Sequence, residues 1–181
     1  MKNLKIQLVL ILSVLISTLS FAQNKKVGGA EMYPSKNIVE NAMNSKDHTT
    51  LVAAIKASGL VETLSGEGPF TVFAPTNAAF ENLPDGTVEN LLKSENKKQL
   101  QTVLTYHVIT GKFNATDVIA AIKKGDGKAE LKTVSGGTLS VMLDGKKVKI
   151  KDSKGNVATV TIADVNQSNG VIHVVDTVLL P

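Results

Sequence analysis

The C-terminal stretch of the sequence, residues 171–180, places the tightest limit on the fold, because it is apolar on both faces of the strand that it predicts. Side chains alternate between the two faces of a strand. The apolar residues therefore form two sets: Val171, Val175 and Leu179, and Ile172, Val174 and Val178. A strand that is apolar on both faces is covered on both sides, so we expect 171–180 to lie in the middle of a sheet.

Two ionisable residues, His173 and Asp176, interrupt this stretch. They are three positions apart and therefore face opposite sides of the strand, so they cannot pair with each other. We expect both to be buried, each with its own hydrogen-bond partner, since an unsatisfied buried polar group costs about 1–3 kcal/mol. Asp176 is the only acid that we expect to be buried, and its expected role is to accept backbone N–H groups near residues 71–80.

The rest of the sequence changes its hydrophobic period half-way. Residues 47–125 contain several short runs with helical spacing and one short apolar strand at 70–74, which ends at Pro75. Later residues alternate with period two, and turn residues such as Asp144-Gly145 separate the expected strands: 131–134, 139–143, 147–151 and 157–165. Helices first and antiparallel strands afterwards predict an α+β domain.

The start of the chain has the features of a cleavable export signal at residues 1–22. Lys2 and Lys5 precede an apolar run from 6 to 16, and small residues lead up to Ala22. We expect cleavage after Ala22. Because the apolar run is shorter than the roughly 20 residues of a membrane span, we expect no integral membrane segment once the signal is removed.

The next segment, residues 23–36, lacks periodicity and contains a glycine pair and a proline, which indicates a flexible linker. Residues 37–181 show no second linker and no internal repeat, so we expect them to form one domain. The chain has no cysteine. The domain therefore has to be stable without disulfides, and thiol catalysis and cysteine metal sites are excluded.

All 20 basic residues of the chain are lysines. Removal of residues 1–22 would take away two of them and lower the formal net charge from +4 to +2. Arginine is the preferred residue for bidentate contacts with phosphate and guanine. Aromatic residues, which stack on bases, make up only 4% of the chain. These features argue against a nucleic-acid partner.

The expected strand 147–151 alternates lysine with apolar residues. Lys147, Lys149 and Lys151 would form a cationic stripe on its outer face. One interpretation is an edge strand whose lysines prevent association with other edges. The other is a docking surface for an acidic polysaccharide or another anionic surface.

The sequence lacks the spacings that catalysis and metal binding require. His48, His107 and His173 show no His-x-His or His-x-x-x-His pattern, and no Gly-x-Ser-x-Gly motif is present. We expect His48 to be exposed at a helix start and the other two to be buried on strands. We expect no metal, no cofactor and no enzymatic activity. The alternative is a small-molecule carrier or enzyme with a pocket near His107 or His173.

Three segments together resemble the fasciclin family of extracellular domains. Residues 71–80 (TVFAPTNAAF) are similar to its first signature, residues 169–181 (NGVIHVVDTVLLP) to its second, and Tyr106-His107 to its central Tyr-His motif. The similarity covers about residues 37–181. It implies a fasciclin-like β-wedge of two sheets with an N-terminal helical layer, in agreement with the α+β pattern.

The resemblance also implies roles for individual residues. Thr76 and Asn77 would start a helix that Phe80 anchors in the core. The structural positions of the two signatures are Thr76, Asn77, Phe80, His173 and Asp176. Tyr106 and His107 correspond to a segment implicated in adhesion in some animal members.

Members of the fasciclin family are extracellular or surface-attached and act in cell adhesion and matrix contact. The resemblance therefore implies a secreted, periplasmic or cell-surface binding module for an extracellular polymer, a surface protein or a glycan. The residues expected to make this contact are Tyr106, His107, Lys147, Lys149 and Lys151. The sequence has no Arg-Gly-Asp tripeptide, so integrin binding does not follow.

Overall fold

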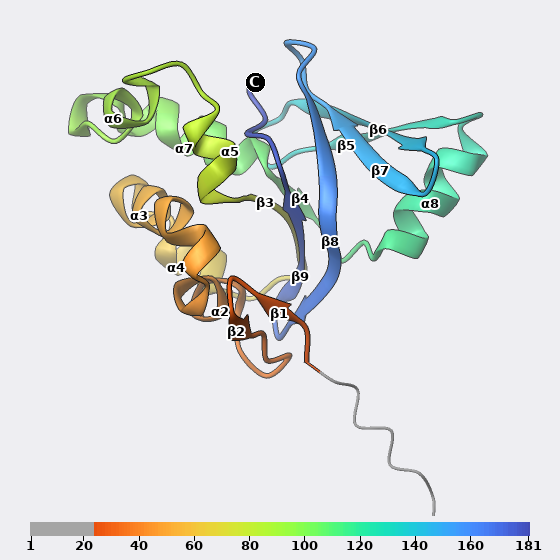
Figure 1. Cartoon of the computed structure of the whole chain (residues 1–181), viewed down its shortest axis with the longest axis horizontal. Helices are drawn as coiled ribbons and strands as arrows, with labels where there is room; N and C mark the ends of the chain where they lie inside the picture. The colour runs from red at the N-terminus through yellow and green to blue at the C-terminus, as the bar shows by residue number, and fades with distance from the viewer. Residues whose placement is uncertain (1–23) are drawn as a thin grey trace, which may run out of the picture.

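The computed structural model describes residues 24–181 and has a helical layer beside a seven-stranded sheet (Figure 1). The signal peptide expected at residues 1–22 lies outside the described residues. The layer consists of α2 (Ile38–Asn44), α3 (Thr49–Ser58), α4 (Val61–Ser65), α5 (Asn77–Glu81), α6 (Thr87–Leu91) and α7 (Lys97–Tyr106), with the 3-10 helices η1 (Lys46–His48) and η2 (Ser94–Asn96). One further helix, α8 (Ala115–Lys124), lies at the opposite end of the molecule. Within residues 24–181, no helix is both long and apolar enough to cross a membrane.

The strands of the sheet run in the order β4 (Val108–Thr110), β3 (Phe70–Pro75), β9 (Gly170–Val175), β8 (Val157–Gln167), β7 (Lys147–Lys151), β6 (Thr138–Asp144) and β5 (Lys128–Lys132). β9 pairs in parallel with β3 and antiparallel with β8. The prediction of a central C-terminal strand held by residues 71–80 is therefore confirmed. The strand is shorter than expected, because it ends at Val175 and the chain bends at Asp176.

The long strand β8 turns this sheet into a wedge. Its first residues pair with β7 and its later residues with β9. The register against β9 shifts on both sides of Ile162, and such irregularities bend a strand and increase its twist. At the open side, a bridge between Ile109 and Thr133 joins the edge strand β4 to the chain just after β5. The two sheets that we expected are thus two halves of one nearly closed sheet.

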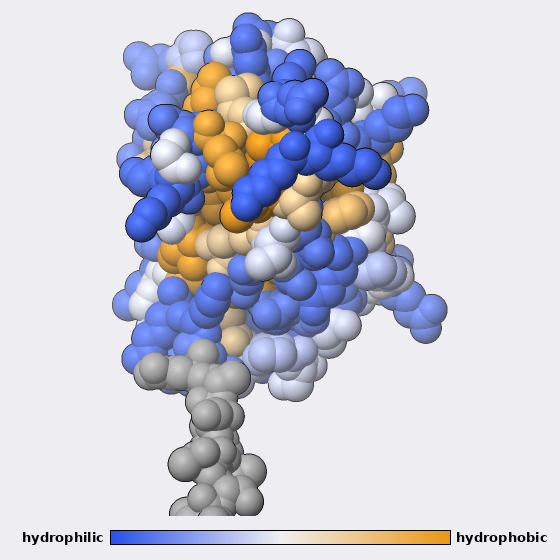
Figure 2. Space-filling view, turned by 90° about the vertical axis from the view of Figure 1, so that its right-hand side faces the viewer, coloured by the Kyte–Doolittle hydropathy of each residue, from blue (hydrophilic) through white to orange (hydrophobic). Residues whose placement is uncertain are grey.

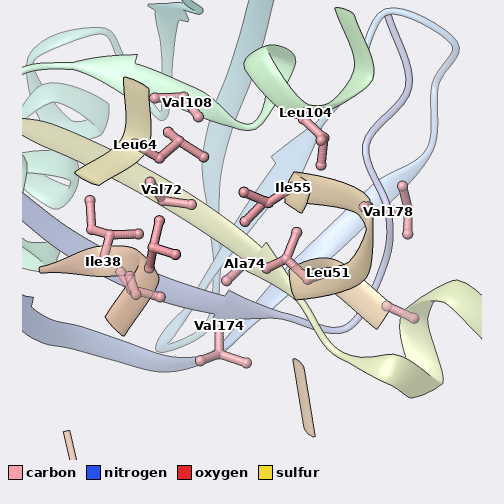
Figure 3. Packing of buried hydrophobic residues seen from close by; sticks show 14 of the residues in the cluster. Ile38, Leu51, Ile55, Leu64, Val72, Ala74, Leu104, Val108, Val174 and Val178 are labelled. Carbon is pink, nitrogen blue, oxygen red and sulfur yellow. The ribbon is translucent and has the colours of Figure 1, made fainter. Parts of the chain in front are cut away.

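Strands β3 and β9 separate two hydrophobic cores, since their side chains alternate between them. Val72 and Ala74 of β3 and Val174 of β9 face the helical layer, where they meet Ile38 and Leu51 (Figure 3). The neighbouring residues of both strands face the inside of the wedge, which also contains side chains from α8, β6 and β7: Phe73, Val175, Ile122, Val141 and Ile150. Both faces of the C-terminal strand are thus covered, as its sequence predicts.

The second core reaches the surface at the end of the molecule that carries α8. Seen from that side, a band of apolar side chains lies between hydrophilic ones (Figure 2). The partly buried residues packed against this core are Phe113, Ile119, Ala129, Leu131, Leu143 and Val160.

The prediction of a flexible linker at residues 23–36 is wrong for the part that the structure describes. A hairpin of β1 (Lys26–Val27) and β2 (Ala30–Glu31) folds back onto the domain. Val27 and Met32 are buried in the first core. The carbonyl oxygen of Gly28, at φ +56°, accepts the N–H of Lys46. Strands of two residues are too short to show a period, so the sequence pattern could not indicate them.

Candidate functional site

Tyr106, which we expected on a contact surface, lies inside the protein with 0% of its surface exposed. It ends α7, and its ring fills the second core. Its hydroxyl donates to the carbonyl oxygen of Thr138 at 2.9 Å and accepts the N–H of Ser153 at 3.1 Å. Tyr106 therefore joins α7 to β6 and to the turn between β7 and β8, and it is not available to a partner.

His107 is also buried, with 3% exposed, and lies at the end of α7 rather than on a strand. Its Nδ1 lies 2.8 Å from the carbonyl oxygen of Val103, and its Nε2 accepts the N–H of Leu179 at 3.0 Å. This pairing requires the neutral ring with hydrogen on Nδ1. Burial lowers the pKa of His107 to about 4, although the Val103 carbonyl oxygen opposes the shift. The ring pins the C-terminal segment to α7.

Asp152 also holds the C-terminal segment, although Asp176 was the only acid that we expected to be buried. It is 6% exposed. Oδ1 accepts the backbone N–H groups of Lys154 and Asn156 at 2.9 and 2.8 Å. Oδ2 accepts the Asn156 side-chain amide at 2.8 Å and the N–H of Leu180 at 2.9 Å. An aspartate at the start of a polar turn of this kind commonly bonds the backbone two residues on, and this was the available signal.

Asp176 does not have the buried position that we expected. It is exposed, and it accepts N–H from Thr159 on β8 at 2.7 Å rather than from residues 71–80. It also accepts the Thr177 hydroxyl at 3.1 Å. Partial burial acts to raise the pKa of Asp176, but these hydrogen bonds outweigh it and lower the pKa below its ordinary value. The chain bends at this residue, which turns its side chain outward.

His173 has the buried, fully hydrogen-bonded position that its sequence predicts. Its Nδ1 accepts the N–H of Asp164 at 3.2 Å, and its Nε2 lies 2.8 Å from the carbonyl oxygen of Phe113. Burial lowers its pKa. With both ring nitrogens occupied in His107 and His173 alike, neither ring has a free nitrogen to act on a substrate.

His48 is buried, with 3% exposed, and the expectation of an exposed residue is wrong. The turn of η1 directs its ring inward, where Nδ1 lies 2.8 Å from the Ser45 hydroxyl. Burial lowers its pKa. Among residues 24–181, no group of three or more histidine, aspartate or glutamate residues is arranged to hold a metal ion.

The residues of the first signature have local structural contacts. The Thr76 hydroxyl accepts the N–H of Ala79 at 3.3 Å and so caps α5. Asn77 donates to the carbonyl oxygen of Lys46 at 2.9 Å and accepts the N–H of Thr50 at 3.0 Å, which ties α5 to η1 and α3. Phe80 packs in the first core.

The lysines of β7 belong to a larger charged surface. β7 lies between β6 and β8 and is not an edge strand, so protection of an edge does not explain its lysines. Strand register brings the outward residues of β5 and β7 onto one face, which we call the lysine face: Lys128, Lys132, Lys147, Lys149 and Lys151. Four of the five are exposed, and Lys149 is half-buried.

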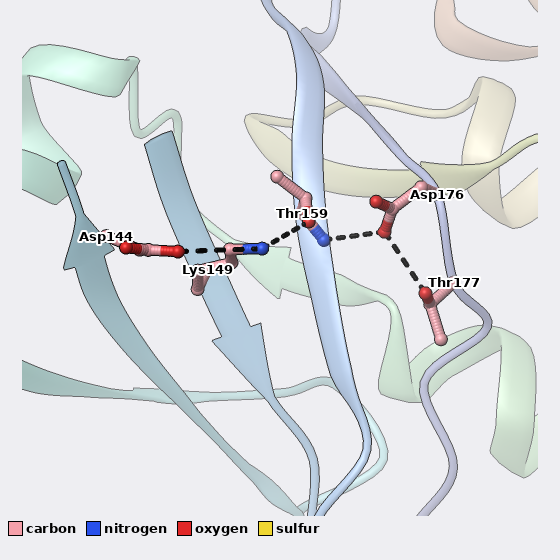
Figure 4. Close-up of polar contacts among 5 residues, drawn as sticks. All are labelled: Asp144, Lys149, Thr159, Asp176 and Thr177. Atoms are coloured by element: carbon pink, nitrogen blue, oxygen red, sulfur yellow. Dashed lines mark hydrogen bonds and ion pairs between the residues drawn. The ribbon is translucent and has the colours of Figure 1, made fainter. Parts of the chain in front are cut away.

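Two carboxylates lie among these lysines. Glu130 is 3.5 Å from Lys128, and Asp144 is 3.9 Å from Lys149. Lys149 also donates to the Thr159 hydroxyl at 2.9 Å, and a line of polar contacts runs across the strands to Asp176 (Figure 4). Asp176 is a third carboxylate beside this face, and its charge interacts with that of Lys149. The lysine face still carries an excess of two positive charges when Asp176 is counted with the two acids of the strands.

Comparison with known proteins places this fold and its signatures in one family. The model of the fasciclin domain matches residues 46–181. "Protein sll1483" of Synechocystis is 52% identical over 144 residues, which cover 80% of this chain and 73% of that protein. The "transforming growth factor-beta-induced protein ig-h3" of Sus scrofa is 36% identical over 148 residues, which cover 82% of this chain but 20% of that longer protein.

A solved structure shows the same fold. It is a FAS1 domain pair from the insect cell adhesion molecule fasciclin I, with a TM-score of 0.71 and 18% identity, and the match covers 81% of this chain and 51% of that chain. The domain match spans most of the sequence and includes both signatures and the buried Tyr106-His107 pair. This chain therefore belongs to the fasciclin domain family.

Proposed function

We propose that this chain is an exported, non-enzymatic binding module whose lysine face contacts anionic polymers outside the cytoplasm, in the envelope or the extracellular matrix. The lysine face carries the proposal. It is the outer surface of four neighbouring strands, and it presents ammonium groups from β5 and β7 without a matching number of acids. The adhesion role named for the insect protein of the same fold supports the proposal.

The residues of the face favour an extended anionic polymer over a small ligand. The lysines stand on two strands with β6 between them, so they form an array rather than a pocket. Residues two apart along a strand are separated by roughly 6.5–7 Å, and alternate strands by roughly 9.5 Å. A chain that carries a carboxylate on successive sugar units presents charges repeatedly over such distances. Such contacts weaken as salt is added.

Binding to a uronic-acid polysaccharide tests this proposal. Affinity electrophoresis or calorimetry with polygalacturonate at low salt is expected to show binding, and neutral dextran is expected to show none. Replacing Lys147, Lys149 and Lys151 together by serine should weaken binding about tenfold or more, because each exposed charge pair contributes up to about 1 kcal/mol. Equal binding by wild type and this triple variant would exclude the lysine face.

A matched control removes the same charge elsewhere. Lys56, Lys93 and Lys98 are exposed on the helical side of the molecule and form no ion pair within residues 24–181. Their replacement by serine changes the net charge equally and should leave binding within about twofold, since it spares the array. If both triple variants lose binding alike, net charge rather than the lysine face governs the contact.

Export is tested separately. If the signal is cleaved after Ala22, N-terminal sequencing of protein recovered outside the cytoplasm should begin at Gln23. Recovery of the full-length chain in the cytoplasm would contradict this part of the proposal.

A further inference from the structure

A groove of about 620 Å³ lies between the helices α6 and α7 on one side and the β7–β8 turn with the C-terminal segment on the other. Figure 1 shows the C-terminus between these two parts of the molecule. The floor of the groove is apolar and consists of Leu91 and Val103, which are buried, and Leu180, which is half-buried, next to Pro181. Its size falls within the range of about 300–1,000 Å³ that is usual for small-ligand sites.

The rim of this α6–α7 groove carries amide and hydroxyl groups with unused hydrogen-bonding capacity. Thr87 and Gln99 make no side-chain hydrogen bond to any other residue in the described part of the chain. The Thr102 hydroxyl donates to the carbonyl oxygen of Lys98 at 3.0 Å, which leaves its oxygen free to accept. Asn90 accepts from Asn96 at 3.2 Å, which leaves its NH₂ group free to donate.

The wall opposite the helices is held in place before any ligand arrives. Asp152 accepts the N–H groups of Lys154 and Leu180. Ser153 donates its N–H to Tyr106 and its hydroxyl to the carbonyl oxygen of Leu180 at 3.3 Å. A ligand that enters the groove therefore does not have to order this turn, and less binding free energy is lost to loop ordering.

The chemistry of the groove fits an uncharged polyhydroxylated ring. Side-chain amides and hydroxyls at the rim match hydroxyl groups around the edge of a sugar, and the apolar floor matches its C–H face. Lys154 and Asp85, the charged side chains that line the groove, are opposite in sign. We propose that the α6–α7 groove binds one neutral sugar unit of an extracellular glycan. The site is separate from the lysine face and does not depend on the function proposed for it.

Titration of the ¹⁵N-labelled protein with neutral disaccharides tests this site. Cellobiose, maltose and N,N′-diacetylchitobiose form the probe set, at concentrations up to tens of millimolar. At least one should shift amide resonances of residues 87–91, 99–103 and 153–155. The Gln99→Ala/Thr102→Val variant should bind that probe with an affinity about tenfold lower than that of the wild type, because it lacks two polar contacts. Its melting temperature should stay unchanged.

A matched variant and the lysine variant complete the experiment. Asn82→Ala/Thr116→Val removes an amide and a hydroxyl from exposed positions outside the groove and should bind as wild type does. The Lys147/Lys149/Lys151→Ser variant should also keep the sugar, so the two sites can fail separately. The proposal is overturned if no probe binds, if the shifted resonances lie elsewhere, or if Gln99→Ala/Thr102→Val binds normally.

Discussion

Two regions that follow each other directly in the sequence have opposite characters. The outward lysines of β7 end at Lys151. Lys147 and Lys151 are exposed and form no side-chain hydrogen bond or ion pair within residues 24–181, and Lys149 donates to the Thr159 hydroxyl. The next residue, Asp152, is buried and accepts four hydrogen bonds. The Tyr106-His107 pair belongs with Asp152, since all three residues tie down the β7–β8 turn or the C-terminal segment.

In this domain, the buried residues stabilise the fold, whereas the exposed residues are the ones that a partner can reach. The residues that carry the family resemblance mostly bond to backbone groups inside the molecule. The polar groups that the lysine face and the groove rim offer to a partner come from segments outside the signatures, on β5, β7, α6 and α7. A family motif therefore identifies the scaffold here, whereas the partner depends on the surface that the scaffold presents.

The largest loss of stability is expected from Asp152→Ala. The substitution leaves four N–H donors without their charged acceptor, and hydrogen bonds to charged groups contribute about 1.5–3 kcal/mol each. Because water reaches the donors in the exposed turn, we expect a total loss of about 4 kcal/mol. The melting temperature should fall by about 10 °C.

Asp47→Ala is the control for this substitution, since Asp47 is exposed and accepts no side-chain hydrogen bond within residues 24–181. It should change the melting temperature by no more than about 2 °C. Thermal unfolding followed by circular dichroism measures both variants. A similar small change in both would mean that Asp152 does not hold the C-terminal segment.

Acid should lower the free energy of unfolding, because His107 is buried in its neutral form. The folded protein lowers the pKa of His107 from 6.5 to about 4, so the unfolded chain binds the proton more readily between these values. Stability is therefore complete above pH 6.5 and is lost as the pH falls towards 4. The expected loss from His107 is roughly 2–3 kcal/mol.

His107→Gln separates this contribution from the others. Burial also lowers the pKa of His48 and His173, so the variant should keep some acid sensitivity. Urea unfolding at pH 7, 5.5 and 4.5 measures the free energy of unfolding at each pH. The variant should be less stable at pH 7 but should show a shallower decline with acid. Parallel curves for wild type and variant would rule out His107 as the titrating group.

The fold was predictable because its signals are local or alternate over many residues. The two-faced apolar pattern of 171–180 correctly placed that strand between others, and Asp144-Gly145 correctly marked the turn between β6 and β7, where Gly145 adopts φ +60°. The β1–β2 hairpin was not predictable, because two-residue strands show no period and their burial depends on a distant surface. Of the two interpretations of residues 147–151, the edge strand was wrong, since the order of strands is set by pairing and not by the sequence of one strand.

The candidate site was less predictable, since burial of a polar residue depends on contacts that are remote in the sequence. Asp152 accepts the N–H of Leu180, which is 28 positions away, and His107 accepts the N–H of Leu179, which is 72 positions away. Neither contact leaves a local pattern. The sequence predicted only the β7 residues of the lysine face, because Lys128 and Lys132 join it through the strand register across β6.

The smallest loss of stability is expected from Asp176→Ala, which tests whether burial distinguishes Asp176 from Asp152. Asp176 resembles Asp152 in accepting backbone N–H, but it is exposed, and within residues 24–181 Thr159 is its one backbone donor. Water can replace an exposed acceptor, so the expected loss is about 1 kcal/mol or less, with a fall in melting temperature of about 2–4 °C. Asp176→Asn keeps an acceptor oxygen and should lie between wild type and alanine. A loss for Asp176→Ala as large as that for Asp152→Ala would show that burial does not distinguish these two residues.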